Sequence, residues 1–215
     1  MADEAALLEA WRSGDQRAGR SLIERCYAPI YRFFFAKVDE QACEDLTQET
    51  FEKLLRRREA YRGDGPFRAY VYGIARFVLI NHIRRRRRHS ERFEPAEDSA
   101  IDPATDSGSA IFAAREHERI VAAALRSLPL DDQIAIELKD WEGLSQSELA
   151  ALFEVPRSTM ATRLVRARSK LRQAIDERMT DPALRVELTE GLDTCMRSIQ
   201  AKIHDHLARP SSGRE

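Results

Sequence analysis

The stretch Phe67–Arg88, FRAYVYGIARFVLINHIRRRRR, organises the interpretation of the whole chain. The residues before the arginine run are apolar on almost all sides of a helix, whereas a surface helix is apolar on one side only. This apolar segment is too short to span a membrane. We therefore expect a helix that is buried on most sides. At about 100° per residue, Arg68, Tyr72 and Arg76 lie within roughly 80° of one another, so two cations and an aromatic ring share one stripe. Such a stripe suits a nucleic-acid strand, because cations attract phosphates and ring faces stack on bases.

The composition predicts an all-α protein that can form a hydrophobic core. The chain has 215 residues, of which 43% are hydrophobic and 33% are charged. Glycine and proline are few, with 9 and 8 residues, and no stretch shows the alternating β-branched pattern of a strand. The net charge of -1 hides basic helices that alternate with acidic stretches, so it does not argue against a nucleic-acid partner.

The helix expected over residues 44–58 carries an acidic stripe opposite its apolar face. Asp45, Gln48, Glu49 and Glu52 follow the spacing i, i+3, i+4 and i+7, and no Lys or Arg lies between them. A charged stripe of this kind is most often a solvated face. Because this stripe carries charge of one sign only, we also interpret it as a docking face for a basic partner protein.

The composition changes abruptly after the arginine run, which indicates a domain boundary. Residues 90–109 are rich in Pro, Ser, Ala and acidic residues and lack periodicity, so we expect a flexible acidic linker. The expected organisation is a first helical domain over residues 1–89, this linker, a second helical domain over residues 110–178, and a C-terminal helix with a disordered tail over residues 179–215.

The second domain contains a helix-turn-helix pattern. Ser145 followed by Glu148 is a capping box, and Pro156 opens the next helix after a short turn. The apolar stripe of that helix is expected to be buried; it consists of Met160, Leu164, Ala167, Leu171 and Ile175. The opposite face carries short polar side chains and cations, as a recognition helix in a major groove requires. An ordinary bundle helix with a solvated basic face is the alternative interpretation.

The sequence shows no catalytic or metal-binding pattern. Cys26, Cys43 and Cys195 are odd in number and widely spaced, which fits neither a disulfide framework nor a zinc site. The five histidines lack ligand spacing, and neither a phosphate-binding glycine loop nor a nucleophile motif is present. We therefore expect a non-enzymatic protein without a cofactor or metal. The acidic N-terminus is unlike a signal peptide and no apolar run reaches membrane-spanning length, so we expect a cytoplasmic protein with no membrane partner.

Two groups of motifs together resemble extracytoplasmic-function sigma factors, the small promoter-specificity subunits of bacterial RNA polymerase. The first group resembles their domain 2 and consists of DLTQETF at 45–51, YRGD at 61–64, FRAYVYGIA at 67–75 and the arginine run. The second group resembles their domain 4 and consists of LP at 128–129, EGLSQSELA at 142–150, VPRST at 155–159 and RLVRAR at 163–168. Each motif alone would be a weak signal. The two groups in this order, with an acidic linker between them, are specific.

The resemblance implies three sets of binding residues. Core RNA polymerase would be bound by the acidic stripe, which consists of Asp45, Gln48, Glu49 and Glu52. The -10 promoter element, melted and held with a flipped base, would be bound through Tyr61, Arg62, Gly63, Asp64, Phe67, Arg68, Tyr72, Arg76, Arg84 and Arg85. The -35 element would be read as duplex through Arg157, Ser158, Thr159, Thr162, Arg163, Val165, Arg166, Ser169 and Lys170. The resemblance also implies that an anti-sigma factor or other regulator could hold the protein inactive.

A free-standing helix-turn-helix regulator that binds duplex DNA as a dimer is the main alternative function. Such a regulator would have no use for the acidic stripe, or for the basic and aromatic stripe that follows it in the chain. These two features therefore favour the sigma-factor interpretation.

Overall fold

The computed structural model describes residues 4–35, 37–57, 60–61, 63, 65–90, 116–179, 198 and 201. Within these residues all regular structure is helical, which confirms the expected all-α class. The chain divides into two compact units, Met1–Phe35 with Glu40–Glu97, and Ala36–Asp39 with Asp98–Glu215. The expected linker lies outside the described residues apart from Ser90, and so does the expected C-terminal helix apart from Met179, Ser198 and Ala201.

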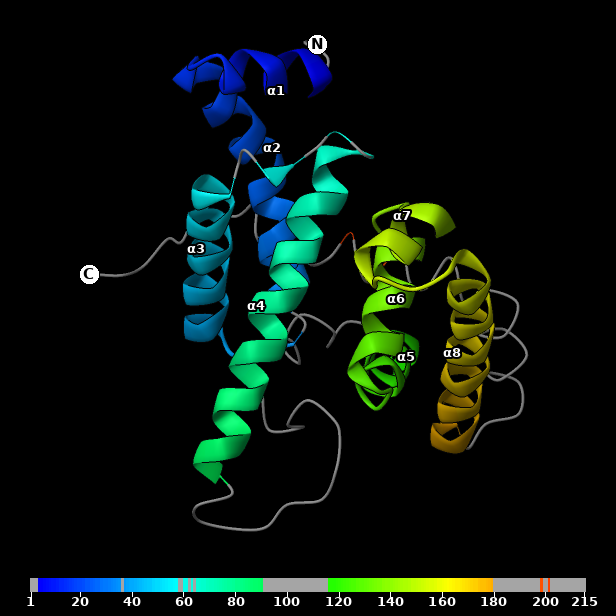
Figure 1. Cartoon of the computed structure of the whole chain (residues 1–215). Helices are drawn as coiled ribbons and strands as arrows, with labels where there is room; N and C mark the ends of the chain where they lie inside the picture. Colours follow the sequence, from blue (N-terminus) through cyan, green and yellow to red (C-terminus); the bar gives the residue numbers. More distant parts are fainter. Residues whose placement is uncertain are drawn as a thin grey trace. The chain divides into compact units, whose positions relative to one another are not determined.

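The first unit consists of four helices, α1 (Glu4–Arg12), α2 (Gln16–Phe35), α3 (Glu40–Arg56) and α4 (Phe67–Ser90). Figure 1 shows α4 as the long green helix beside α2 and α3, with α1 across one end of α2. Asp15 begins α2, because its carboxylate accepts hydrogen bonds from the backbone N–H groups of Arg17 at 2.8 Å and Ala18 at 3.3 Å. The four helices enclose one apolar core.

Helix α4 is buried on most sides, as the sequence predicts. The side chains of Val71, Ala75 and Leu79 are fully buried. At the start of the helix, Phe67 packs edge-on against Trp11 of α1 with 6.2 Å between ring centroids. One turn later, Tyr72 packs edge-on against Phe33 of α2 at 5.8 Å. Aromatic contacts therefore hold the first half of α4 against two other helices.

The second unit consists of α5 (Glu116–Arg126), α6 (Leu130–Asp140), α7 (Gln146–Leu152) and α8 (Arg157–Arg178). The expected capping box is confirmed, because the Ser145 hydroxyl accepts a hydrogen bond from the Glu148 N–H at 3.2 Å and the Glu148 carboxylate accepts one from the Ser145 N–H. The turn between α7 and α8 places Glu154 at φ 55°, a left-handed conformation that a side chain disfavours. The apolar stripe of α8 is buried, as expected.

One residue from the C-terminal part of the chain contacts the second unit. The Ser198 hydroxyl donates a hydrogen bond to the Glu118 carboxylate of α5 at 2.8 Å. Glu118 is almost completely buried, with 2% of its surface exposed, whereas Ser198 is half-buried, so this contact is partly shielded from solvent. The C-terminal part of the chain therefore contributes at least one polar contact to the second unit.

We predict that Gly19 is required where α1 meets α2. A Cβ atom at Gly19 would lie 2.3 to 2.6 Å from ring atoms of Trp11, which is itself buried. Gly19→Ala should therefore lower the free energy of unfolding by about 1 to 3 kcal/mol, the usual cost of overpacking. Gly73→Ala in α4 is the matched control, because no atom lies within 4 Å of its added Cβ. The control should stabilise the protein by about 0.5 to 1 kcal/mol through helix propensity. Denaturant unfolding measures both, and equal effects would contradict the prediction.

Candidate nucleic-acid and protein interfaces

The outward face of α8 presents the residue types of a recognition helix. All nine residues expected there are described; Arg163 is half-buried, Val165 is 69% exposed, and the other seven are exposed polar or basic residues. Those seven are Arg157, Ser158, Thr159, Thr162, Arg166, Ser169 and Lys170. The face is short and polar near the helix start, where Thr162 donates a hydrogen bond to the Ser158 carbonyl at 3.1 Å. The helix is therefore amphipathic in the sense that the sequence predicts, with a polar and basic face turned to solvent.

Several cations of α8 are paired with aspartates of α6. Lys170 Nζ lies 2.7 Å from Asp132 Oδ2, and Arg163 Nη1 lies 3.6 Å from Asp131 Oδ2. The Arg163 guanidinium also lies over the Phe153 ring, 5.3 Å from its centroid. These pairs fix the two side chains along the seam between α6 and α8. Any contact that Arg163 or Lys170 makes with a phosphate must compete with an aspartate.

The aromatic residues expected to face the -10 strand are buried, which corrects one sequence-based expectation. Tyr72 is 1% exposed and packs against Phe33, so its ring is not on a surface stripe with Arg68 and Arg76. Arg68 is exposed and Arg76 is half-buried. The expectation is wrong because α2 crosses α4 at this turn and covers the side of the helix that carries Tyr72.

The loop before α4 is anchored by rings and exposes its glycines. Tyr61 and Phe67 are 8% and 2% exposed, and their ring centroids lie 5.6 Å apart in an edge-on contact. The two rings are packed into the base of the loop, and their expected role in binding the -10 element stays a prediction. Gly63 and Gly65 are exposed at φ 87° and 127°, conformations that favour glycine. The expected site residues Arg62 and Asp64 lie outside the described residues.

The basic end of α4 is turned to solvent. The five consecutive arginines, Arg84, Arg85, Arg86, Arg87 and Arg88, are all exposed. Their side chains can reach an anion outside the first unit, because guanidinium groups bind phosphate oxygens in a two-pronged geometry.

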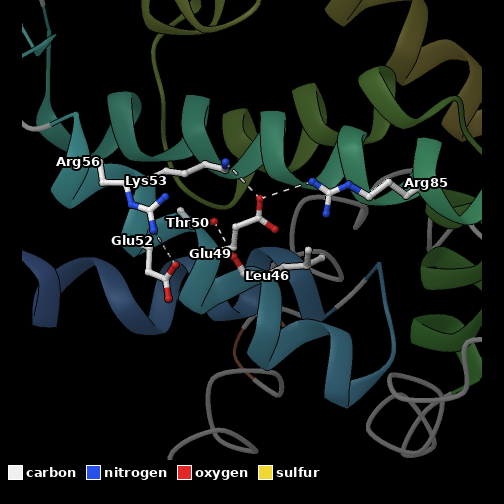
Figure 2. A network of polar contacts seen from close by, with 7 residues as sticks. All are labelled: Leu46, Glu49, Thr50, Glu52, Lys53, Arg56 and Arg85. Atoms are coloured by element: carbon white, nitrogen blue, oxygen red, sulfur yellow. Dashed lines mark hydrogen bonds and ion pairs between the residues drawn. The ribbon is translucent and has the colours of Figure 1, made fainter.

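The acidic stripe of α3 is accessible but partly neutralised by its own helix. Asp45, Gln48 and Glu52 are exposed and Glu49 is half-buried. Lys53 Nζ lies 3.3 Å from Glu49, and Arg56 lies 3.7 Å from Glu52, each one turn further along α3. Figure 2 shows both pairs. The sequence-based expectation of a stripe of one sign is incomplete, because cations just beyond the stripe reach back at the i,i+4 spacing.

Two side chains at the seam between α3 and α4 were not among the expected site residues. Phe77 is 50% exposed, and Lys53 Nζ lies 5.8 Å from the centroid of its ring. The signal for Lys53 is present in the sequence as an i,i+4 spacing to Glu49. The signal for Phe77 is absent, because an apolar residue within an apolar helix is expected to be buried.

Cys26 and Tyr70 of the first unit have shifted pKa values, and both shifts are caused mainly by burial. Burial, with a smaller effect of Glu4, raises the pKa of the Cys26 thiol to about 12, so this cysteine stays protonated at neutral pH. Burial also raises the pKa of the Tyr70 phenol. Among the described residues, no group of three or more His, Cys, Asp or Glu side chains is arranged to hold a metal ion. No helix within the described ranges is long and apolar enough to cross a membrane.

Known protein families match both units. The family model Sigma-70 region 2 matches residues 22–89, and the model Sigma-70, region 4, matches residues 118–171. The first match covers most of α2, all of α3, and α4 up to its last residue, and the second covers most of α5, all of α6 and α7, and most of α8. A free-standing helix-turn-helix regulator would not account for the region 2 match.

Two solved complexes, one of them of a sigma factor, contain a chain with the same fold. RpoE of Bartonella quintana, in complex with the anti-sigma factor NepR, aligns with a TM-score of 0.56 and 22% identity, covering 75% of this chain and 97% of that one. CnrH, in complex with the cytosolic domain of CnrY, aligns with a TM-score of 0.56 and 25% identity, covering 81% of this chain and 97% of that one.

Similar curated proteins are named ECF RNA polymerase sigma-E factor. The protein from Haemophilus influenzae is 29% identical over 183 residues, which are 82% of this chain and 97% of that protein. The protein from Escherichia coli K12 is 30% identical over 187 residues, which are 82% of this chain and 94% of that protein. With both sigma regions in order and this similarity over nearly the whole relative, the chain belongs to the extracytoplasmic-function sigma factors, the promoter-specificity subunits of bacterial RNA polymerase.

Proposed function

We propose that this sigma factor uses three separate surfaces during transcription initiation. The acidic stripe of α3 binds core RNA polymerase, the loop before α4 and the exposed cations of α4 bind the -10 element, and α8 reads the -35 element. The observation that carries the proposal is the outward face of α8, where short polar side chains and Arg166 are exposed opposite a fully buried apolar stripe. This is the pattern that base-edge contacts in a major groove require.

The described residues expected to bind the -10 element include buried aromatic side chains and exposed residues, and we propose a different role for each group. Tyr61, Phe67 and Tyr72 position the loop and helix from within the core. The exposed described groups that remain to contact the strand are Gly63 and Gly65 of the loop, the Arg68 guanidinium and the arginines at the end of α4. Gly63 and Gly65 carry no side chain, and a Cβ added at either would meet no atom within 4 Å, so a nucleotide can approach the backbone closely at these two residues.

The proposed function requires binding surfaces only. We infer that the protein has no catalytic activity of its own and works in the cytoplasm, where RNA polymerase acts. The two solved relatives were captured with a second protein, one of them named as an anti-sigma factor. We therefore include a regulatory protein of that kind among the expected partners. We also retain the proposed boundaries at residues 89, 109 and 178 as the limits of the functional parts.

Core binding is tested by reversing one charge of the acidic stripe. Asp45→Arg should weaken binding to core RNA polymerase by about tenfold or more, because an opposed charge in an interface costs at least 1.4 kcal/mol. Glu177→Arg is the matched control, since Asp45 and Glu177 are both exposed and each accepts a hydrogen bond from the glutamine four residues before it. Binding to labelled core enzyme measures both variants. Equal affinity of the Asp45 variant and the control would remove α3 from the interface.

Promoter reading is tested at Arg166. Arg166→Ala should cost about 1 to 3 kcal/mol of binding free energy at a single base pair of the -35 element and relax the preference there. Arg172→Ala, which removes another exposed arginine of α8, should leave base preference unchanged. Competition between promoter variants, measured with holoenzyme, separates the two effects. A uniform loss over all sequences would instead identify Arg166 as a phosphate contact.

A further inference from the structure

The structure brings together one residue from the proposed polymerase surface and one from the proposed DNA surface. Glu49 lies on the acidic stripe of α3, and Arg85 lies in the arginine run of α4. Arg85 Nη2 lies 4.0 Å from Glu49 Oε1, and Lys53 Nζ lies 3.3 Å from the same oxygen. Figure 2 shows both cations directed at the one carboxylate from opposite sides. Residues 36 positions apart in the chain thus share a contact across the seam between α3 and α4.

The Glu49 carboxylate lies within ion-pair distance of both cations. Lys53 also lies over the ring of Phe77 on α4, so its ammonium is divided between a carboxylate and an aromatic face. Glu49 is half-buried, with 30% of its side chain exposed, and is thus less well hydrated than the exposed Asp45 and Glu52. We therefore expect Arg85 to add to the stabilisation that the Glu49 carboxylate receives from Lys53 and from water.

We propose that the Glu49–Arg85 ion pair couples polymerase binding to DNA binding. In the free factor, Glu49 and Arg85 partly neutralise each other, which lowers the affinity of the acidic stripe for polymerase and of the arginine run for DNA. When core polymerase engages Glu49, Arg85 is released and can bind a promoter phosphate. Conversely, a phosphate that takes Arg85 leaves Glu49 available to the polymerase. This inference rests on the proposed function of the acidic stripe and extends it from two independent surfaces to two linked ones.

The strength of the contact suits such an exchange. Arg85 is 66% exposed and the two charged atoms are at the edge of ion-pair distance, so the pair is weak and easily broken. Exposed pairs of this kind shift an equilibrium by about two- to fivefold. By thermodynamic reciprocity, the factor by which polymerase strengthens DNA binding through this pair must equal the factor by which DNA strengthens polymerase binding. The ion pair therefore couples polymerase binding and DNA binding only modestly.

The DNA arm of the test uses the free full-length protein and duplex DNA of random sequence over a range of salt concentrations. Glu49→Gln releases Arg85 and should raise the affinity about two- to fivefold and steepen the log-log salt slope by about 0.9, the value of one added phosphate contact. Glu24→Gln is the matched control, because it removes the same charge and breaks an exposed Arg–Glu pair, Arg20–Glu24 at 2.9 Å, elsewhere in the same unit. The control should leave the slope unchanged. In an Arg85→Ala background, Glu49→Gln should also leave the slope unchanged.

The polymerase arm uses core enzyme without DNA. Arg85→Ala exposes Glu49 and should tighten core binding about two- to fivefold, whereas Arg20→Ala should not change it. Glu49→Gln should weaken core binding, as the proposed function alone requires. If Glu49→Gln leaves core binding intact, the proposed role of Glu49 fails. If it weakens core binding but the salt slope and the Arg85→Ala affinity equal those of the controls, the polymerase surface stands and the coupling is overturned. Weaker core binding by Arg85→Ala would overturn the coupling as well.

Discussion

The first unit depends on the burial of α4 against three other helices. Phe67 contacts Trp11 of α1, Tyr72 contacts Phe33 of α2, and Phe77 contacts Lys53 of α3, so successive turns of one helix are held by different partners. A helix of 24 residues spans roughly 36 Å, which separates the loop at its start from the arginines at its end. Because the core holds the helix along its first half, the loop at its start and the arginines at its end keep a defined position on the same rigid element.

Several charged side chains on the proposed binding surfaces are paired with one another within the protein itself. Glu49 is shared by Lys53 and Arg85 on one unit, and on the other Lys170 and Arg163 lie against Asp132 and Asp131. These pairs are partly exposed to solvent, which weakens them, so they restrict the side chains without holding them permanently. A partner of opposite charge replaces them at little cost. The same arrangement limits non-specific attraction, since a cation that already has an acidic neighbour presents a smaller field to distant phosphates.

The helical elements and the helix-turn-helix were accessible from the sequence because they depend on neighbours along the chain. The capping box at Ser145 and Glu148 is a local contact across three residues, and the buried stripe of α8 follows a helical period. The placement of Tyr72 was not accessible in this way. Its spacing to Arg68 and Arg76 indicated a shared stripe, but Tyr72 also lies seven residues, about two helical turns, before the buried Leu79. Only the position of α2 decides between these two readings of the same period.

The sequence by itself determined the all-α class, the recognition helix with its outward face, and the family to which the motifs belong, because these rest on periodicity and on short spacings. The tertiary structure decided which aromatic rings are anchors and which cations are already paired. Tyr61, Phe67 and Tyr72 are buried by residues far away in the chain, and Glu49 meets Arg85 only because α3 and α4 pack side by side. Burial and long-range ion pairs are set by how helices cross, and a one-dimensional pattern carries no direct record of that geometry.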